Sequence, residues 1–299
     1  MSTSQLPLLV TGASGHLGQR VIAHLLNTLK IPAGQIIATT RNPEALAGFA
    51  AKGVIVRKAD FEDTAALAKA FTGARRLLLI STDALDRPGR RLAQHINAVQ
   101  AAVDAGVQHV VYTSMPKPAG SPLLIAPDHL GTEQALSAAP LSWTVLRNNW
   151  YFENLFMSLQ QVLASGQWFT AAGDGKIAHI ARDDLALAAA AALASNDTGK
   201  ATYTLSGAEA FTTAEIARLV SQTAGKPIQV VQVPVEGLIQ GLVDAGLPEG
   251  LAAVFASFDT NTRAGGVADI TGDFRKLTGV APLAYRDWLL ANKAAISGT

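Results

Sequence analysis

Apolar residues follow two different periods along the first half of the chain. Short runs rich in Leu, Val and Ile have the length and composition of buried strands, and they lie at 7–11, 35–40, 54–58, 76–80, 107–113 and 142–147. Longer stretches, in which apolar residues recur every three or four positions, separate these runs at 16–29, 43–52, 63–72, 87–105 and 126–139. Strands that alternate with helices in this way predict an α/β fold built on a Rossmann-type, doubly wound parallel sheet.

The pattern becomes irregular after about residue 150. Expected elements there are a long helix at 152–165, an Ala-rich helix at 183–194, and strands at 203–207 and near 228–233. We therefore expect a Rossmann domain over 1–149, to which 176–207 returns, and a smaller, mainly helical substrate-binding region over most of 150–299. That region should face the carboxyl ends of the strands, where open α/β sheets bind ligands.

Composition narrows the class of protein. Hydrophobic residues make up 49% and charged residues 16% of the chain, which is typical of a well-buried globular protein. The 24 basic and 23 acidic residues nearly cancel, so there is no large positive field to hold nucleic acid. Cysteine is absent, which excludes disulfides and thiolate chemistry and fits a reducing compartment.

No segment has the pattern of an export or membrane signal. The start of the sequence lacks a basic region before its first apolar run, unlike a signal peptide. The most apolar stretch, 185–194, is far shorter than the roughly 20 residues that cross a bilayer. We therefore expect a cytoplasmic protein with no membrane insertion and no nucleic acid partner, and either a monomer or a dimer.

Three glycines separate the first expected strand from the first helix. Gly12, Gly15 and Gly18 form a G-x-x-G-x-x-G spacing in "TGASGHLG". Glycine at such a junction permits a tight turn and lets backbone N–H groups approach the diphosphate of a dinucleotide, although a glycine turn can also simply join two elements. The Rossmann domain is therefore expected to bind NAD(P), and the candidate contacts in this loop are Thr11, Gly12, Ser14, Gly15, His16, Leu17 and Gly18.

The ends of the next strands carry further candidates. Arg41 follows the second strand, where a basic residue favours the 2′-phosphate of NADPH; a solvated surface arginine is the alternative. Asp60 ends the third strand and could meet the adenine amino group or cap the following helix. Hydroxyl residues end the fourth and fifth strands, and we expect them along the path of the cofactor: Ser81, Thr82, Thr113 and Ser114.

The tyrosine–lysine pair of short-chain dehydrogenases is missing. In those enzymes a tyrosine, with a lysine four residues later, protonates the carbonyl oxygen of the substrate; none of the four tyrosines here has that lysine. The helix expected at 126–139 instead carries His129 and Glu133 one turn apart. Either the two side chains share a hydrogen bond on the helix surface, or His129 relays a proton. A metal site is not expected, because the other histidines are scattered.

The missing acid indicates which kind of acceptor the chain favours. Hydride addition to a simple ketone forms an alkoxide, whose basicity is close to that of hydroxide, the conjugate base of water with a pKa of about 15.7. Addition to a quinone forms a phenolate, whose conjugate acid has a pKa of about 10. This difference of roughly six pKa units lowers the demand for an internal acid by about 8 kcal/mol. The sequence therefore favours acceptors that tolerate negative charge, a condition that quinones and cationic dyes meet.

Several segments together resemble one family. "TGASGHLG", "ATTRNPE", "VRKADFED", "LLLIST", "DHLGTEQAL", "LRNNWYFEN" and "AAGDGKIA" are similar to segments of the NmrA-like atypical short-chain dehydrogenases, and the likeness covers nearly the whole chain. The resemblance implies an extended Rossmann fold, NADPH as the hydride donor, and a quinone-like acceptor or a dye. Sensors with this fold bind NAD(P) without turnover, so a non-catalytic redox sensor is the alternative function.

The resemblance also implies a role for the loop after the sixth strand, 147–151. We expect Asn148 to bind the nicotinamide carboxamide or a developing oxyanion, and Trp150 and Tyr151 to stack on a planar acceptor. Both rings could instead fill the seam between the two regions. Asn149, a further candidate for acceptor binding, stands where quinone-reducing members have glycine. The candidate catalytic residues are Asn148, Tyr151 and His129, and water is a further source of the proton.

Overall fold

Seven strands form the main sheet within residues 7–298, the part of the chain that the computed structural model describes. Their order across the sheet is β3-β2-β1-β4-β5-β6-β9. The strands are β1 (Leu8–Val10), β2 (Ile36–Thr40), β3 (Ile55–Lys58), β4 (Arg76–Leu79), β5 (His109–Ser114), β6 (Ser142–Asn148) and β9 (Lys200–Leu205). The first six run parallel to one another, which confirms the expected doubly wound sheet of the Rossmann type.

The strands form where the sequence has continuous apolar runs. Every residue of β1, β2, β4 and β5 is buried, as expected when helices cover both faces of a parallel sheet. Leu9 of β1, for example, is paired with Ile37 on one side and with Leu77 on the other. The six strands expected from the first half of the sequence are confirmed, with small differences at their ends.

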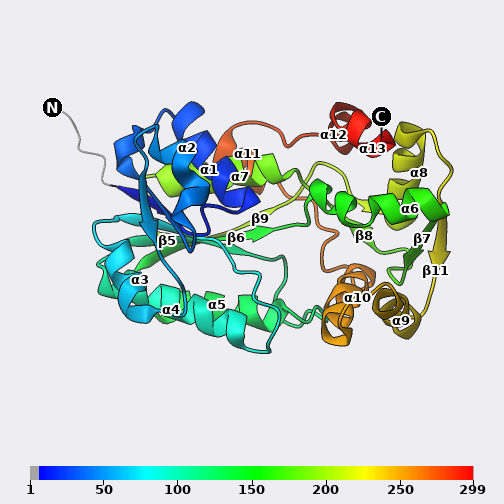
Figure 1. Ribbon diagram of the computed structural model, residues 1–299, viewed down its shortest axis with the longest axis horizontal. Helices are drawn as coiled ribbons and strands as arrows, with labels where there is room; N and C mark the ends of the chain where they lie inside the picture. Colours follow the sequence, from blue (N-terminus) through cyan, green and yellow to red (C-terminus); the bar gives the residue numbers. More distant parts are fainter. Residues whose placement is uncertain (1–6, 299) are drawn as a thin grey trace. The chain divides into compact units, whose positions relative to one another are not determined.

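Helices cover both faces of the main sheet (Figure 1). One face carries α3 (Thr64–Phe71), α4 (Arg90–Asp104) and α5 (Ala126–Ala138). The other carries α1 (His16–Asn27), α2 (Ala47–Ala50, after a 3-10 turn at Pro43–Leu46) and α7 (Arg182–Ala194). On the first face Leu67, Ala98 and Leu136, one from each helix, share a hydrophobic core with residues of β4 and β5. This burial holds the helices on the sheet.

The described chain divides into two compact units. Unit 1 contains the chain up to Met115 together with 128–147 and 185–203, and unit 2 contains 116–127, 148–184 and the chain from Thr204 onward. Four segments differ from the boundaries expected from the sequence: 116–127, 148–149, 176–184 and 204–207. The connection 116–127 between β5 and α5 belongs to unit 2, and so does 176–184, which was expected to return to the Rossmann domain.

Hydrogen bonds explain why 116–127 belongs to unit 2. Ser121 Oγ donates to Asn261 Oδ1 at 2.8 Å, and the Leu124 N–H donates to Ser257 Oγ at 3.1 Å. Both partners belong to helix α10 (Glu249–Arg263), which is more than 130 residues later in the chain. A local hydrophobic pattern contains no information about such partners.

Unit 2 is mainly helical, as expected, with two small two-stranded sheets. Its helices are α6 (Leu159–Ser165), α8 (Thr213–Ala224), α9 (Val235–Asp244), α10, α11 (Asp273–Thr278), α12 (Tyr285–Ala291) and α13 (Lys293–Ser297). One small sheet pairs β8 (Lys176–Ile177) with β10 (Phe211–Thr212), and the other pairs β7 (Gln167–Thr170) with β11 (Gln229–Gln232). Figure 1 shows α8 with α12 and α13 on one side of this unit, and α9 with α10 on another.

The long helix expected at 152–165 is wrong in part. The segment forms a 3-10 turn at Phe152–Met157, and α6 begins only after Ser158. Phe152 and Leu155, three residues apart, are the buried residues of the turn, and this spacing matches the three-residue repeat of a 3-10 helix. Both side chains join a core that Tyr285 and Trp288 complete from the far end of the chain.

No helix among the described residues combines the length and the apolar character needed to cross a bilayer.

Candidate active site

The glycine loop between β1 and α1 has the geometry that a dinucleotide requires. Gly12 adopts a φ of +57°, a conformation that L side chains rarely adopt. A Cβ on Gly18 would come 2.5 Å from the carbonyl oxygen of Gly12, so only glycine allows α1 to approach the loop this closely. A Cβ on Gly15 would come 3.3 Å from the same oxygen.

The amino end of α1 offers backbone donors to an anion. Gly15 caps the helix without a side-chain hydrogen bond, and the first turn contains no acidic residue. The N–H groups of that turn have no acceptor within the helix, and they coincide with the positive end of its dipole. Leu17 is buried, so its side chain packs inward, whereas His16 is exposed. The loop therefore fits a diphosphate.

The end of β2 meets the glycine loop through two hydroxyl groups. Ser14 Oγ and Thr40 Oγ1 are 2.8 Å apart. Arg41, the next residue, is exposed, and its guanidinium is available for a phosphate beside the loop. A role in binding the 2′-phosphate stays a prediction, but the location of Arg41 fits it.

Asp60 does not cap the next helix. Asp63 is the N-cap of α3, and its carboxylate accepts from the N–H of Ala66 at 3.1 Å. Asp60 Oδ1 accepts from the N–H of Glu62 at 3.0 Å and so shapes the turn after β3. The capping interpretation of Asp60 was therefore wrong, while its contact with adenine stays a prediction.

Three consecutive backbone N–H groups after β4 each donate to a side chain. The donors are Ile80, Ser81 and Thr82, and the acceptors, in the same order, are Thr11 Oγ1 at 3.0 Å, Thr113 Oγ1 at 2.9 Å and His95 Nε2 at 3.0 Å. Thr11 Oγ1 also donates to the carbonyl of Leu78. The hydroxyls of Thr11 and Thr113 thus hold the exit of β4 in place. Their expected contact with a cofactor stays a prediction.

Glu133 of α5 accepts hydrogen bonds from two strands. Ser114 Oγ, at the end of β5, donates to Glu133 Oε1 at 2.7 Å. Arg147 of β6 donates from Nε to Oε1 at 3.0 Å and from Nη2 to Oε2 at 2.6 Å. The Ser114 hydroxyl therefore has a partner within the protein, and the sequence contained no sign that Glu133 would be that partner.

His129 lies in the interior of unit 1, not on the helix surface. Its Nδ1 is 2.9 Å from the Tyr112 hydroxyl and its Nε2 is 3.0 Å from Arg91 Nη2. The side chain is 4% exposed, and burial lowers the pKa of the ring well below its ordinary value. The surface hydrogen bond with Glu133 was therefore wrong, because both ring nitrogens have other partners. A buried, neutral ring also gives no support to a proton relay through His129.

The loop after β6 contains an unpartnered acceptor. Asn148 is 5% exposed, and its side-chain oxygen Oδ1 is buried without a hydrogen bond among the described residues. A buried carbonyl oxygen without a donor costs about 1–3 kcal/mol, so such an atom calls for a ligand or a water. An amide N–H₂ group of a ligand would satisfy it.

Asn149 is part of the protein's interior. It is 1% exposed; Nδ2 donates to the carbonyl of Val267 at 2.9 Å, and Oδ1 accepts from the N–H of Trp150 at 2.8 Å. Both polar atoms of its side chain are thus occupied within unit 2. This contradicts the expectation that Asn149 contacts the acceptor, and it gives the residue a structural role.

The two aromatic rings of the loop have neighbours within unit 2. The Trp150 ring lies 4.9 Å from that of Phe258 in α10, and its Nε1 is buried without a hydrogen bond among the described residues. The Tyr151 ring lies 5.2 Å from the guanidinium carbon of Arg182. Phe258 and Arg182 were not expected from the sequence, since only the fold brings them to the loop. Acceptor binding by Trp150 and Tyr151 stays a prediction.

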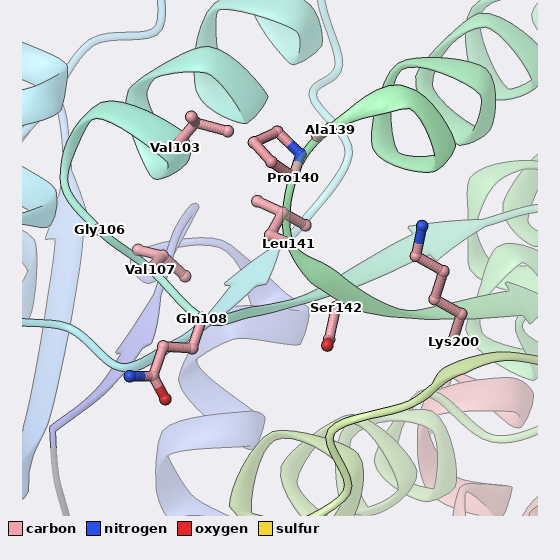
Figure 2. Close-up of a pocket in the computed structure, with 9 residues that line it drawn as sticks. All are labelled: Val103, Gly106, Val107, Gln108, Ala139, Pro140, Leu141, Ser142 and Lys200. Atoms are coloured by element: carbon pink, nitrogen blue, oxygen red, sulfur yellow. The ribbon is translucent and has the colours of Figure 1, made fainter.

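A separate hollow of about 630 Å³ lies at the other edge of the main sheet (Figure 2). Its lining comes from the connections that lead into β5 and β6 and from the start of β9: Val103, Gly106, Val107, Gln108, Ala139, Pro140, Leu141, Ser142 and Lys200. These residues lie at the amino ends of β5 and β6, whereas the glycine loop follows the carboxyl end of β1. Because the strands are parallel, the hollow and the glycine loop lie at opposite ends of the strands, so the hollow is not the nucleotide site. Within residues 7–298 no three histidine or carboxylate side chains gather as metal ligands would.

Comparison with protein families decides the class of the fold. The model of the NmrA-like family matches residues 5–278. The chain belongs to the NmrA-like family. Quinone oxidoreductase 2 of Escherichia coli is 39% identical to this chain over 270 residues, which cover 90% of this chain and 93% of the relative. An NAD(P)H azoreductase of Xenophilus azovorans is 26% identical over 289 residues, which cover 96% of this chain and 98% of the azoreductase.

Two solved structures show the same architecture. The NADPH complex of the E. coli NADPH-dependent quinone oxidoreductase has a TM-score of 0.89 and 37% identity, and the match covers 94% of this chain and 98% of that one. The NADP(H) complex of the Citrobacter sp. triphenylmethane reductase has a TM-score of 0.86 and 36% identity over 95% of this chain and 99% of that one. The family and the extended Rossmann fold expected from the sequence are therefore confirmed.

Proposed function

We propose that this NmrA-like protein is a reductase that transfers hydride from NADPH to a quinone or a similar planar acceptor, triphenylmethane dyes included. The observation that carries the proposal is Oδ1 of Asn148 at the carboxyl end of β6, which is buried and has no hydrogen-bond partner within residues 7–298. This atom can accept a hydrogen bond from the carboxamide of a nicotinamide ring. The similarity to a quinone oxidoreductase and to a triphenylmethane reductase supports the choice of acceptor.

The residues of the chain fit NADPH along the carboxyl edge of the sheet. The uncapped amino end of α1 and the glycine loop suit the diphosphate. Arg41 suits the 2′-phosphate, where a charge-assisted hydrogen bond contributes about 1.5–3 kcal/mol. When bound, NADPH supplies the hydride from its nicotinamide ring.

The protein's own contribution is mainly to hold the reactants in place. Trp150 and Tyr151 offer flat surfaces to a planar acceptor. The indole N–H of Trp150, which is buried without a partner among the described residues, can donate to an oxygen of an acceptor that reaches it. Positioning of this kind accounts for a large part of the rate enhancement in bimolecular reactions. The proton then comes from water or from the Tyr151 hydroxyl. We do not assign it to His129, because that ring is buried and both nitrogens have partners.

The test is a set of assays in which NADPH oxidation is followed with quinones and triphenylmethane dyes. The proposal expects oxidation that depends on the acceptor, and a Trp150→Ala variant should lose most of it at unchanged affinity for NADPH. Trp150→Phe is the matched control for ring stacking, since it removes the N–H and keeps a flat ring. Tight NADPH binding without oxidation by any acceptor would support the alternative, a non-catalytic redox sensor.

The cytoplasmic location stays a prediction, which cell fractionation tests.

A further inference from the structure

The carboxylate of Glu133 joins the last paired residues of two neighbouring strands. Ser114 and Arg147 are register partners where β5 and β6 end. Glu133, from α5, accepts one hydrogen bond from Ser114 and two from Arg147, at 2.6–3.0 Å. One side chain thus holds both ends of the final rung of the β5–β6 ladder.

The geometry makes this contact stronger than an ordinary surface ion pair. Arg147 binds in the bidentate form, in which two parallel N–H groups match two carboxylate oxygens. The Glu133 side chain is 13% exposed and that of Arg147 is 29% exposed, so solvent screens the pair only in part. The bond therefore restrains the backbone of β6 at Arg147, which is the residue directly before Asn148.

We propose that Glu133 is a positioning residue for the nicotinamide ring: it holds Arg147, and through the backbone it orients the carboxamide-binding Asn148. The inference rests on the proposed function. We assign Glu133 a structural part only, since its two oxygens accept three hydrogen bonds from Ser114 and Arg147. Its effect reaches the cofactor only through the strand that it restrains.

The test compares the affinity for two probes, NADPH and 2′,5′-ADP, which lacks the nicotinamide ring. In a Glu133→Gln variant we expect the affinity for 2′,5′-ADP to stay within about twofold, because the groups that suit its phosphates belong to the glycine loop and Arg41. The fluorescence of bound NADPH, which reports the surroundings of the ring, should shift toward that of free NADPH. The turnover number with a quinone should fall about 10- to 100-fold.

Arg147→Lys provides a second variant, which keeps the charge and loses the bidentate contact. It should cause a smaller shift of the NADPH fluorescence and a smaller fall of the turnover number. Asp104→Asn is the matched control, since it converts another helix carboxylate into an amide at an exposed position, where the carboxylate accepts a hydrogen bond from Gln100 of the same helix. The control should change neither fluorescence nor turnover.

Three outcomes would overturn the inference: unchanged fluorescence and turnover in Glu133→Gln, equal losses for NADPH and 2′,5′-ADP, or an Arg147→Lys variant that behaves like the unaltered protein. If Glu133→Gln does not fold, Arg147→Lys alone decides by the same readouts. The fluorescence measurement needs no turnover. A protein that binds NADPH but reduces no acceptor would therefore refute the proposed function, and the fluorescence of bound NADPH would still decide the positioning role of Glu133.

Discussion

The hydroxyl of Tyr112 lies 2.9 Å from Nδ1 of His129 in the interior of unit 1. On the other side of the ring, Arg91 Nη2 lies 3.0 Å from Nε2. A guanidinium can only donate, so Nε2 accepts and Nδ1 carries the proton. His129 is therefore neutral, and burial, followed by the charge of Arg91, keeps the pKa of the ring well below its ordinary value.

A second buried histidine is neutral for the same kind of reason. His95 Nε2 accepts from the N–H of Thr82 at 3.0 Å, so its Nδ1 carries the proton and donates to Thr132 Oγ1 at 2.9 Å. The Thr132 hydroxyl is free to accept, because its own proton goes to the carbonyl of Asp128. Burial lowers the pKa of His95 from 6.5 to about 3.

These two rings predict how stability depends on pH. Their pKa values are lower in the folded than in the unfolded protein, so the unfolded chain binds more protons below pH 6.5, and acid shifts the balance toward unfolding. Each ring should cost about 1.4 kcal/mol of stability per pH unit below its unfolded pKa. Urea unfolding between pH 7.5 and 5 measures this slope. His109 and His179, whose pKa values fall to about 4, add to it in the unaltered protein.

A His129→Gln variant isolates the contribution of one ring. The uptake of protons on unfolding, taken from the slope of stability against pH, should fall by about one relative to the unaltered protein. The turnover of NADPH near neutral pH should keep its pH profile, because the pKa of the ring in the folded protein lies well below its ordinary value. A slope that stays the same would show that His129 is already protonated in the fold.

Substitution of Gly18 should disturb the nucleotide loop. A Cβ there would come 2.5 Å from the Gly12 carbonyl oxygen and 2.8 Å from the Cα of Ala13, both backbone atoms that cannot move cheaply. Gly18→Ala should cost about 1–3 kcal/mol of stability and weaken NADPH binding, as calorimetry can measure. Gly48→Ala in α2 is the control, because its Cβ would meet nothing within 4 Å and alanine favours a helix. Equal behaviour of the two variants would refute the close approach at Gly18.

Arg41→Asp should change the choice of cofactor. The variant replaces the proposed partner of the 2′-phosphate with a like charge, so kcat/KM for NADPH should fall about 10- to 100-fold and that for NADH should not. Steady-state kinetics with both cofactors measure the ratio. Arg218→Asp, the same change at an exposed position of α8 in unit 2, should leave the ratio unchanged. An unaltered ratio in Arg41→Asp would mean that Arg41 is an ordinary solvated residue.

Arg76 should matter for stability without affecting the chemistry. The residue is 6% exposed, and its guanidinium donates to the carbonyls of Ala192 and Leu193 at the carboxyl end of α7, where a cation is favoured, and to that of Asp197 just beyond it. Arg76→Met would leave buried carbonyls without donors and should lower the free energy of unfolding by about 3 kcal/mol.

Urea unfolding measures the loss, and the neighbouring exposed residue provides the control. Arg75→Met should change stability by less than about 0.5 kcal/mol. The turnover of folded Arg76→Met protein should match that of the unaltered protein. A large fall in turnover would place Arg76 in a role that this carbonyl contact does not explain.

The fold of unit 1 and the nucleotide loop could be predicted from the sequence. Both depend on local features: apolar runs of strand length, helical periodicity, and glycines between a strand and a helix. The two halves of 152–165 were harder to separate, because apolar residues three apart suit a 3-10 turn as well as an α-helix.

Partners that are far apart in the sequence decided the rest. For His129 the sequence left a surface hydrogen bond or a proton relay open, because Arg91, 38 positions away, and Tyr112 are not visible in the pattern of its own helix. Asn149 was expected at the acceptor because of its place in the loop after the sixth strand; its partner Val267, which lies 118 positions later, is not visible in that loop.

The sequence by itself determined which segments of unit 1 become strands and helices and where glycines let a diphosphate approach the backbone, since these properties depend on neighbouring residues. Only the tertiary structure decided which polar side chains are hydrogen-bonded within the protein. It also decided which of them, like Asn148, have a buried atom that finds no partner among the described residues and can bind a ligand. The physical reason is that a buried polar group needs a partner, and folding chooses that partner from the whole chain.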